Sequence, residues 1–177
     1  MNLYLRLLKV LLSLPFLHRR GLFDTSTVHF RSWPNDLDLN LHVNNGRYLT
    51  FMDLGRIHLL AQMGLLGTVV RRAWQPVLTA AEINFIRAIG PFQRFALVTR
   101  LLTWDEKYFY LEQQFMRGET LCAVASVRGL FIARGRRIAP AEALSVLQID
   151  AVAPAMPVLI QHWNDLMEIK KDQATAR

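Results

Sequence analysis

Apolar and polar residues alternate along most of the second half of the chain, and this alternation predicts β-strands. The alternating segments are 95–104, 108–117 and 120–133. Short polar turns separate them, which predicts consecutive antiparallel strands. A first strand is expected at 25–33. A long, kinked strand is expected at 69–89, where Pro76 marks a bend or an edge position.

A long apolar helix is predicted to begin near Asn45, directly after a polar loop. Asn44 is the expected N-cap, because its side-chain oxygen can accept an N–H of the first turn. Apolar residues nearly encircle the axis of this helix, which is typical of a helix buried on most sides. One strand, a buried helix and several antiparallel strands together predict an α+β fold, in which a curved sheet of about five strands wraps the helix.

The N-terminal segment 1–21 is predicted to hold an amphipathic helix. Its polar residues recur on one helix face: Asn2, Arg6, Lys9 and Ser13. Such a helix can lie in a membrane interface, where Arg6 and Lys9 would meet lipid head groups. It can equally pack on its own domain or on a subunit partner. Its charges interrupt the apolar run too often for a membrane-spanning segment.

The core domain is expected at 22–134, and 135–177 should form C-terminal helices and a tail. Pro140 is expected to start a short helix, and a final helix should reach about Ile169. The remaining residues, 170–177, are expected to be disordered.

Composition narrows the possible partners. The 177 residues suit one domain, and the net charge of +7 makes an anionic partner plausible, such as nucleic acid, a phosphorylated cofactor or an acidic membrane. The arginines are scattered, which argues against nucleic acid. The single cysteine, Cys122, lies in an apolar run and implies no oxidising compartment, and no metal-ligand spacing is present. We expect a cytoplasmic protein, with peripheral membrane contact through residues 1–20 as an open alternative.

Candidate chemistry is concentrated in the loop before the long helix. This loop carries Asp36, Asp38, His42, Asn44 and Asn45. Turn statistics alone favour Asx turns and helix caps for these residues. Asp53 and Arg56, three apart within the helix, are expected to pair with one another or with the sheet, and have no catalytic role in this interpretation.

The sequence D-x-x-x-H-V-N-N-G-x-Y at 38–48 resembles the hotdog-fold acyl-CoA thioesterases of the 4-hydroxybenzoyl-CoA thioesterase type. The run DLDLNLHVNNGRYL is most similar to the thioesterase-superfamily-member-6-like branch. The resemblance implies a hotdog fold, a homodimer or homotetramer, and hydrolysis of acyl-CoA to free acid and CoA in a cleft between subunits. It implies no cofactor beyond the CoA of the substrate. Many relatives have glycine directly before the histidine, where this chain has Leu41.

The resemblance also implies roles for individual residues. Asp38 matches the catalytic aspartate, acting as nucleophile or general base. N–H groups near Asn45 and Gly46 would bind the oxyanion. The remaining expected roles are orientation of the aspartate or water by His42 and Asn44, a place in the acyl pocket or near the carbonyl for Tyr48, and binding of the CoA phosphates by rim arginines among Arg87, Arg94, Arg134, Arg136 and Arg137.

Two other functions remain open at this point. Hotdog hydratases and dehydratases also use aspartate with histidine, although the Asn-Asn pair and the helix start match the thioesterases better. A non-catalytic acyl-binding or membrane-associated scaffold is the other alternative, which the amphipathic N-terminus favours.

Overall fold

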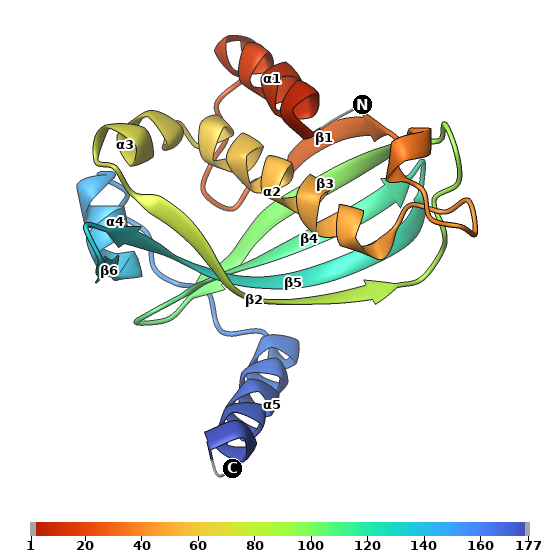
Figure 1. The fold of residues 1–177 in the computed structure, drawn as a ribbon. Helices are drawn as coiled ribbons and strands as arrows, with labels where there is room; N and C mark the ends of the chain where they lie inside the picture. The colour runs from red at the N-terminus through yellow and green to blue at the C-terminus, as the bar shows by residue number, and fades with distance from the viewer. Residues whose placement is uncertain (1–2, 176–177) are drawn as a thin grey trace.

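The computed structural model describes residues 3–175, so the predicted helix residue Asn2 and residues 176–177 lie outside it. It has the predicted α+β architecture, in which a curved antiparallel sheet wraps α2 (Asn45–Gln62). Figure 1 shows α2 lying across the hollow of the sheet. The strands are β1 (Ser26–Arg31), β2 (Gln75–Phe85), β3 (Arg94–Trp104), β4 (Phe109–Arg117), β5 (Thr120–Ala133) and β6 (Arg136–Ile138).

The sheet has the order β1-β3-β4-β5-β2, with the short β6 paired to β5. All pairings are antiparallel. The second strand along the chain therefore ends up at the edge of the sheet, beyond β5, and this edge position explains how Pro76 is accommodated. Leu78 and Phe85 of this strand remain exposed.

The predicted strand 69–89 is wrong over its first part. Residues Leu66–Arg71 form a short helix, α3, and β2 begins only at Gln75. The reason is packing: Val69 and Trp74 are both buried in a small second core, where Trp74 contacts the ring of Phe131 at 5.6 Å. A helical turn brings these two side chains to the same side, which a continuous strand does not.

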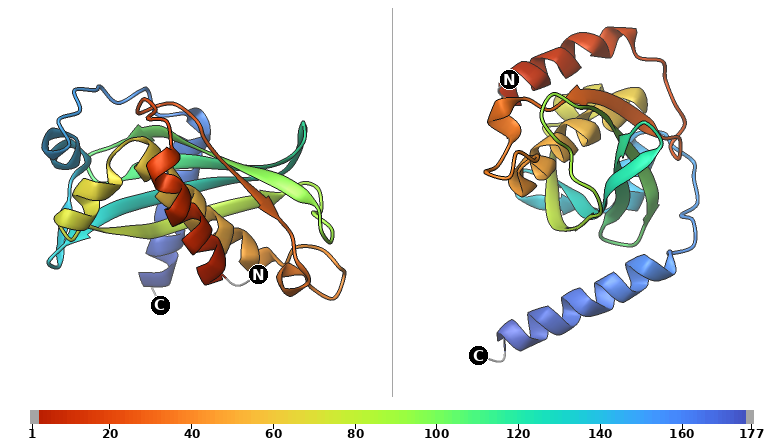
Figure 2. Two further views of the ribbon diagram at one scale, coloured as in Figure 1. Left: turned by 90° about the horizontal axis from the view of Figure 1, so that it is seen from above. Right: turned by 90° about the vertical axis from the view of Figure 1, so that its right-hand side faces the viewer.

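In the described part of the chain, two helices follow the domain that the sheet and α2 form. Helix α4 (Pro140–Val146) begins at the predicted proline. Helix α5 (Val158–Thr175) is longer than predicted, because Lys170, Lys171 and Gln173 are good helix formers. The expected disorder is therefore wrong for residues 170–175. Figure 2 shows that α5 lies on the opposite side of the sheet from α1 (Leu3–Ser13).

Helix α2 lies very close to the sheet at Gly55. A Cβ atom at this position would lie 2.7 Å from Leu97 Cδ2, 2.8 Å from Thr99 Oγ1 and 2.9 Å from Gln113 Nε2. The fully buried Gln113 bridges the two layers, since its Nε2 donates to the Met52 carbonyl at 3.0 Å and to Thr99 Oγ1 at 2.9 Å. The lack of a side chain at Gly55 therefore allows α2 to lie close to the sheet, and the buried amide of Gln113 holds it there through hydrogen bonds.

Helix α1 is followed by a short 3-10 helix, η1 (Leu14–Phe16). It packs on the domain through a face that holds the buried Arg6 and Val10 and the partly buried Leu7. Arg6 is fully buried and forms a bidentate ion pair with the buried Asp36, at the end of the short helix η2 (Pro34–Asp36). The expectation that Arg6 meets lipid head groups is therefore wrong. The buried carboxylate on the domain draws this arginine inward, because neither charge is tolerated alone in the core. Val10 is buried beside it.

Candidate active site

The loop from Leu37 to Val43 is closed by a bridge between these two residues and by hydrogen bonds to Asp38. Asp38 Oδ1 accepts the N–H of Asn40 at 2.9 Å and the N–H of His42 at 3.2 Å. The Asp38 N–H in turn donates to the His42 carbonyl at 2.8 Å. The half-buried carboxylate of Asp38 is therefore held in a fixed orientation by the backbone of its own loop.

Leu41 occupies a left-handed conformation in this loop, with φ of +57°. Glycine adopts this conformation without cost, whereas a residue with a Cβ atom does not. The backbone at Leu41 therefore has a conformation that suits glycine better than leucine. The side chain points outward and is 62% exposed.

Asp36 has a structural environment that differs from that of Asp38. Besides Arg6, it accepts hydrogen bonds from Arg47 Nη2 at 2.8 Å and from the Trp33 N–H at 2.9 Å. Burial by itself would raise the pKa of this carboxyl, but these hydrogen bonds outweigh burial and hold the pKa below its usual range. Asp36 therefore joins α1, η2 and the first turn of α2.

The first turn of α2 is capped as predicted. Asn44 Oδ1 accepts the Gly46 N–H at 2.9 Å, and the Asn44 carbonyl accepts the Arg47 N–H at 2.8 Å. The expectation of a free N–H at Gly46 is therefore wrong, because the cap uses it. The side chains of His42 and Asn45 are exposed beside this turn.

Tyr48 lies in the aromatic core. Its ring contacts Phe85 at 4.9 Å and Phe115 at 4.7 Å between centroids, and only 3% of its surface is exposed. Burial raises the pKa of its hydroxyl to about 12. Tyr48 is therefore a core residue of its own chain, and it does not line the apolar pocket beside the second half of α2.

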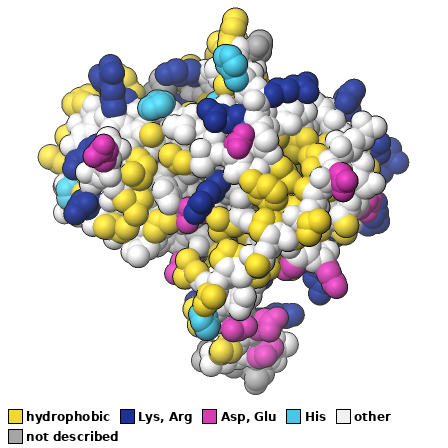
Figure 3. All heavy atoms as spheres, turned by 180° about the vertical axis from the view of Figure 1, so that it is seen from behind, with side chains coloured by type: hydrophobic (Ala, Val, Ile, Leu, Met, Phe, Trp, Pro, Cys, Tyr) yellow, Lys and Arg dark blue, Asp and Glu magenta, His cyan; other side chains and the backbone are white. Residues whose placement is uncertain are grey.

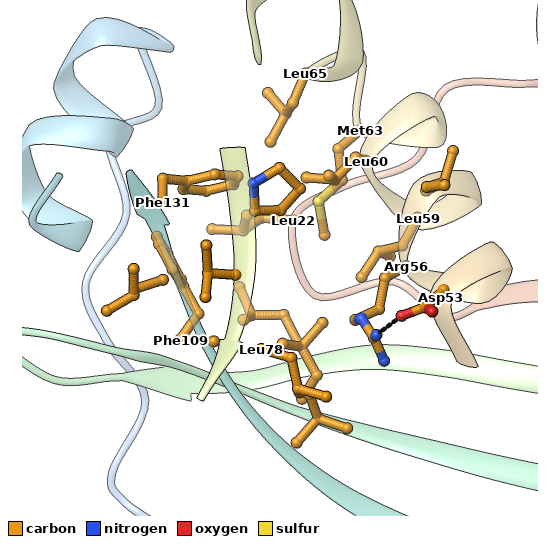
Figure 4. A pocket seen from close by; sticks show the side chains of 18 of the residues that line it. Leu22, Asp53, Arg56, Leu59, Leu60, Met63, Leu65, Leu78, Phe109 and Phe131 are labelled. Carbon is orange, nitrogen blue, oxygen red and sulfur yellow. Dashed lines mark hydrogen bonds and ion pairs between the residues drawn. The ribbon is translucent and has the colours of Figure 1, made fainter. Parts of the chain in front are cut away.

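An apolar pocket of about 320 Å³ opens between the second half of α2 and the strands β2, β4 and β5. Figure 4 shows Leu59, Leu60 and Met63 on one side and Leu78, Phe109 and Phe131 on the other. Its volume is at the lower end of the range for small-molecule sites, and its lining suits a hydrocarbon or aromatic group.

The only charged residues lining this pocket, among the described residues, are Asp53 and Arg56. They form the expected ion pair, drawn as a dashed line in Figure 4, and Arg56 Nη1 also donates to Gln113 Oε1 at 2.9 Å. Asp53 is 60% exposed on its side chain. The pairing with each other and with the sheet is confirmed, but sequence reasoning missed that the pair lies at a pocket. The clue available in the sequence was a charged pair within an otherwise apolar helix.

Asp38 and the pocket lie at different ends of α2 within one chain. From Asn45 to Asp53 the helix rises about 12 Å. The residues lining the pocket include neither Asp38 nor His42. One chain therefore presents a polar loop and an apolar pocket that are separated along the helix.

The expected rim arginines are also divided between the two ends of the sheet. Arg87 lies near the polar loop, since its N–H donates to the Cys122 carbonyl and the Ile89 carbonyl accepts the Val43 N–H. Arg134 and Arg136 follow the far end of β5, roughly 35 Å along the strand from Cys122 at 3.3 Å per residue. Arg136 pairs with Glu142 through two hydrogen bonds, at 2.8 and 2.6 Å. Within one chain these three arginines therefore do not share one rim, and binding of the CoA phosphates by some of them stays a prediction.

The remaining sequence expectations concern metals and the cysteine. Within residues 3–175, no group of three or more His, Cys, Asp or Glu side chains is arranged to hold a metal ion. Cys122 is a free, buried core residue, as predicted. No helix in the described part of the chain is long and apolar enough to cross a membrane.

A family model and individual relatives among known proteins agree on the family to which this chain is similar. Residues 32–164 match the model of a family described as the thioesterase-like superfamily. The chain is 31% identical over 162 residues to Protein THEM6 of Drosophila melanogaster, covering 89% of this chain and 81% of that protein. It is 25% identical over 128 residues to a probable thioesterase of Saccharomyces cerevisiae, covering 70% of this chain and 55% of that protein.

Solved structures agree with this match. A probable thioesterase from Bartonella henselae is 26% identical and aligns with a TM-score of 0.60. The alignment covers 66% of this chain and 98% of that chain, so about a third of this chain is left unmatched.

Proposed function

Because the chain belongs to the thioesterase-like superfamily, whose hotdog fold its structure shares, we propose that it hydrolyses acyl-CoA thioesters to free acid and CoA. The family and the fold predicted from the sequence are confirmed by these matches. The observation that carries the proposal is the apolar pocket beside α2, which offers an acyl group a site with almost no polar lining. Fold alone does not specify the reaction, which depends on the side chains at the site.

Asp38 is the proposed catalytic carboxylate. A thioester carbonyl needs either a nucleophile or a base that activates water, and a carboxylate can serve as both. The two backbone N–H groups on Oδ1 orient it before substrate binds. This supports a preorganised catalytic group, because no side-chain rotation is needed during the reaction.

The backbone N–H of Asn45 is the proposed oxyanion donor. The N–H groups of Gly46 and Arg47 are already donated to Asn44, which leaves Asn45 as the first-turn residue suited to this role. The positive end of the helix dipole adds to the stabilisation of developing negative charge. The thiolate of CoA is a good leaving group, so this scheme needs no metal.

Within one chain Asp38 lies far from the apolar pocket, and a second copy of the chain is proposed to bring a loop and a pocket together. Strand β2 ends the sheet, and its exposed Leu78 and Phe85 favour pairing with another copy. A symmetric contact would place the same strand against itself. In such a homodimer or a homotetramer, the loop of one protomer can face the pocket of its partner, and Arg87 can reach CoA phosphates.

A panel of acyl-CoA substrates tests the proposal. Purified protein is incubated with aliphatic acyl-CoAs of increasing length and with aromatic acyl-CoAs, and release of free thiol is followed. We expect hydrolysis of at least one member. Absence of turnover across the panel, with acyl-CoA still bound in a direct binding assay, would instead support the non-catalytic acyl-binding scaffold.

Substitution of three aspartates then identifies the catalytic group. Asp38→Asn is nearly isosteric and should lower the rate by about 10²–10⁴-fold with little change in melting temperature. Asp24→Asn is the matched control, since this exposed carboxylate accepts only a local N–H from Gly21, and it should leave the rate unchanged. If Asp38→Asn retains activity within a few-fold while Asp53→Asn loses it, the catalytic carboxylate lies at the pocket and the assignment of Asp38 is wrong.

A further inference from the structure

The outward face of α1 and η1 is a continuous apolar stripe. Its exposed residues are Tyr4, Leu5, Leu8, Leu11, Leu12 and Phe16. Their spacing places them on one side of the helix. Phe16 is 83% exposed and Tyr4 73%, so the domain itself does not cover them. We refer to these six residues as the outer stripe.

The opposite face fixes the helix in this orientation. Arg6 is buried in its ion pair with Asp36, and its guanidinium lies 4.5 Å from the centre of the Phe51 ring. Rotating α1 to bury the outer stripe would pull Arg6 away and leave Asp36 with less compensation in the core. The stripe is therefore a stable feature of the folded domain, and it stays available to something outside the chain.

Basic residues flank the outer stripe. Lys9 is exposed on α1, and His18, Arg19 and Arg20 are exposed just beyond η1. Arg31 and Arg94, paired across β1 and β3, line a groove of about 730 Å³ between α1 and β1. Within the described residues, no Asp or Glu lines this groove.

Figure 3 shows one face of the molecule, on which Lys and Arg side chains lie along the upper edge, on the side of α1, and at both sides. Single Asp and Glu side chains lie among them, and a group of Asp and Glu side chains lies at the lower end on α5. An apolar stripe bordered by positive charge is complementary to a lipid bilayer with anionic head groups, which is apolar in its interior and negatively charged at its surface.

From this arrangement we propose that α1 lies in the interface of an anionic lipid bilayer, with the outer stripe among the acyl chains and the flanking basic residues on the head groups. The proposal is independent of the proposed hydrolase activity. A second copy of the chain is a less suitable occupant, because a symmetric pairing of the two α1 helices would bring Lys9, near the middle of α1, close to Lys9 of the other copy. The stripe is also only about 20 Å long along the helix axis, which is short for a stable helix pair.

Vesicle co-sedimentation of the full chain tests the proposal. The probes are phosphatidylcholine vesicles with and without phosphatidylglycerol. We expect binding to the anionic vesicles, weaker binding to the neutral ones, and a loss of binding as salt is raised. Equal absence of binding to both kinds of vesicle would overturn the proposal.

Two matched pairs of variants locate the contact. Leu5→Ser/Leu8→Ser/Leu12→Ser should weaken vesicle binding by at least about tenfold, because three apolar side chains are lost from the interface. Val152→Ser/Leu159→Ser removes exposed apolar residues far from α1 and should leave binding unchanged. Arg19→Glu/Arg20→Glu should also weaken binding to anionic vesicles, whereas Lys170→Glu/Lys171→Glu on α5 makes the same charge change and should have a much smaller effect.

A melting curve and light scattering accompany each variant. Because the outer stripe is exposed, its triple variant should stay folded and melt only slightly lower than the wild type, by the amount that the weaker helix propensity of serine causes. Vesicle binding that survives the triple variant would overturn the proposal. A triple variant that loses an oligomer present in the wild type, with no vesicle binding by either protein, would show that the stripe joins copies of the chain and would also overturn it.

Discussion

Arg6 and Asp36 form a buried, bidentate ion pair that joins the N-terminal helix to the segment just before the candidate catalytic loop. Arg47 of α2 donates to the same carboxylate, and Arg6 also donates to the Arg31 carbonyl at 3.1 Å. One carboxylate therefore fixes α1, the end of β1 and the first turn of α2. Asp36 lies two residues before Asp38, so the geometry of the loop depends on a contact with residue 6.

Replacing Arg6 tests this dependence. Arg6→Met keeps an unbranched apolar side chain but removes the charge and the guanidinium that lies over the Phe51 ring, so it should lower the free energy of unfolding by about 3 kcal/mol. The expected loss is at the lower end for a broken buried pair, because Arg47 and the Trp33 N–H still compensate Asp36. Urea unfolding measures the change. Arg100→Met is the matched control: it breaks the more exposed pair with Glu112 and should cost at most about 1 kcal/mol.

Acid should destabilise the protein in two steps, set by two groups whose pKa values are lowered in the fold. Burial, aided by Arg20, lowers the pKa of His58 from 6.5, and its Nδ1 lies 2.7 Å from Ser26 Oγ. The unfolded chain therefore binds the proton more readily, so stability is full above pH 6.5 and falls as pH drops through the folded pKa. The contribution of Asp36 to stability also decreases as pH falls, but at lower pH than that of His58. Its contribution is present above 3.8 and is lost as pH falls through its lowered folded pKa.

Unfolding free energies measured across this range check both steps. His58→Gln removes the first titrating group, so its stability should change less than that of the wild type just below pH 6.5. A wild-type protein that becomes more stable as pH falls from 7 to 5 would contradict the assignment of His58.

Gly55→Ala should destabilise the protein although alanine is the better helix former. The new Cβ atom would meet Leu97, Thr99 and Gln113 at less than 3 Å, so the helix or the sheet must shift. We expect a loss of about 1–3 kcal/mol from overpacking. Gly67→Ala in α3 is the matched control, because nothing lies within 4 Å of its added Cβ, and it should be neutral or stabilise by up to about 1 kcal/mol. Equal effects of the two variants would exclude the close approach at Gly55.

Leu41→Gly should relieve backbone strain in the candidate catalytic loop. The left-handed conformation costs a leucine roughly 1–2 kcal/mol, and glycine removes this cost while adding entropy to the unfolded chain. Leu39→Gly, at an exposed neighbour outside the left-handed region, adds only the entropy and should destabilise. Thermal melting of both variants is the measurement, and Leu41→Gly should be the more stable by about 1 kcal/mol or more. The opposite order would show that Leu41 is not strained.

The sequence alone determined the parts of this structure that depend on neighbouring residues. Alternation located β3, β4 and β5, because successive side chains of a strand point to opposite faces. The cap at Asn44 and the pair Asp53–Arg56 were also predictable, because each contact joins residues within one helical turn. The motif at 38–48 indicated the family.

Only the tertiary structure decided which distant residues meet. The same polar face of α1 fitted a lipid surface or a protein contact, and the buried carboxylate of Asp36, 30 positions along the chain, turned Arg6 inward. The helix at 66–71 formed because Val69 and Trp74 pack against a core built from later residues. The antiparallel pairing of β2 with β5 placed Arg87 and Arg134 at opposite ends of the sheet, and the packing of α2 on the strands left a pocket between them. Local patterns fix the conformation of a segment, whereas burial and charge compensation across the sheet fix what that segment faces.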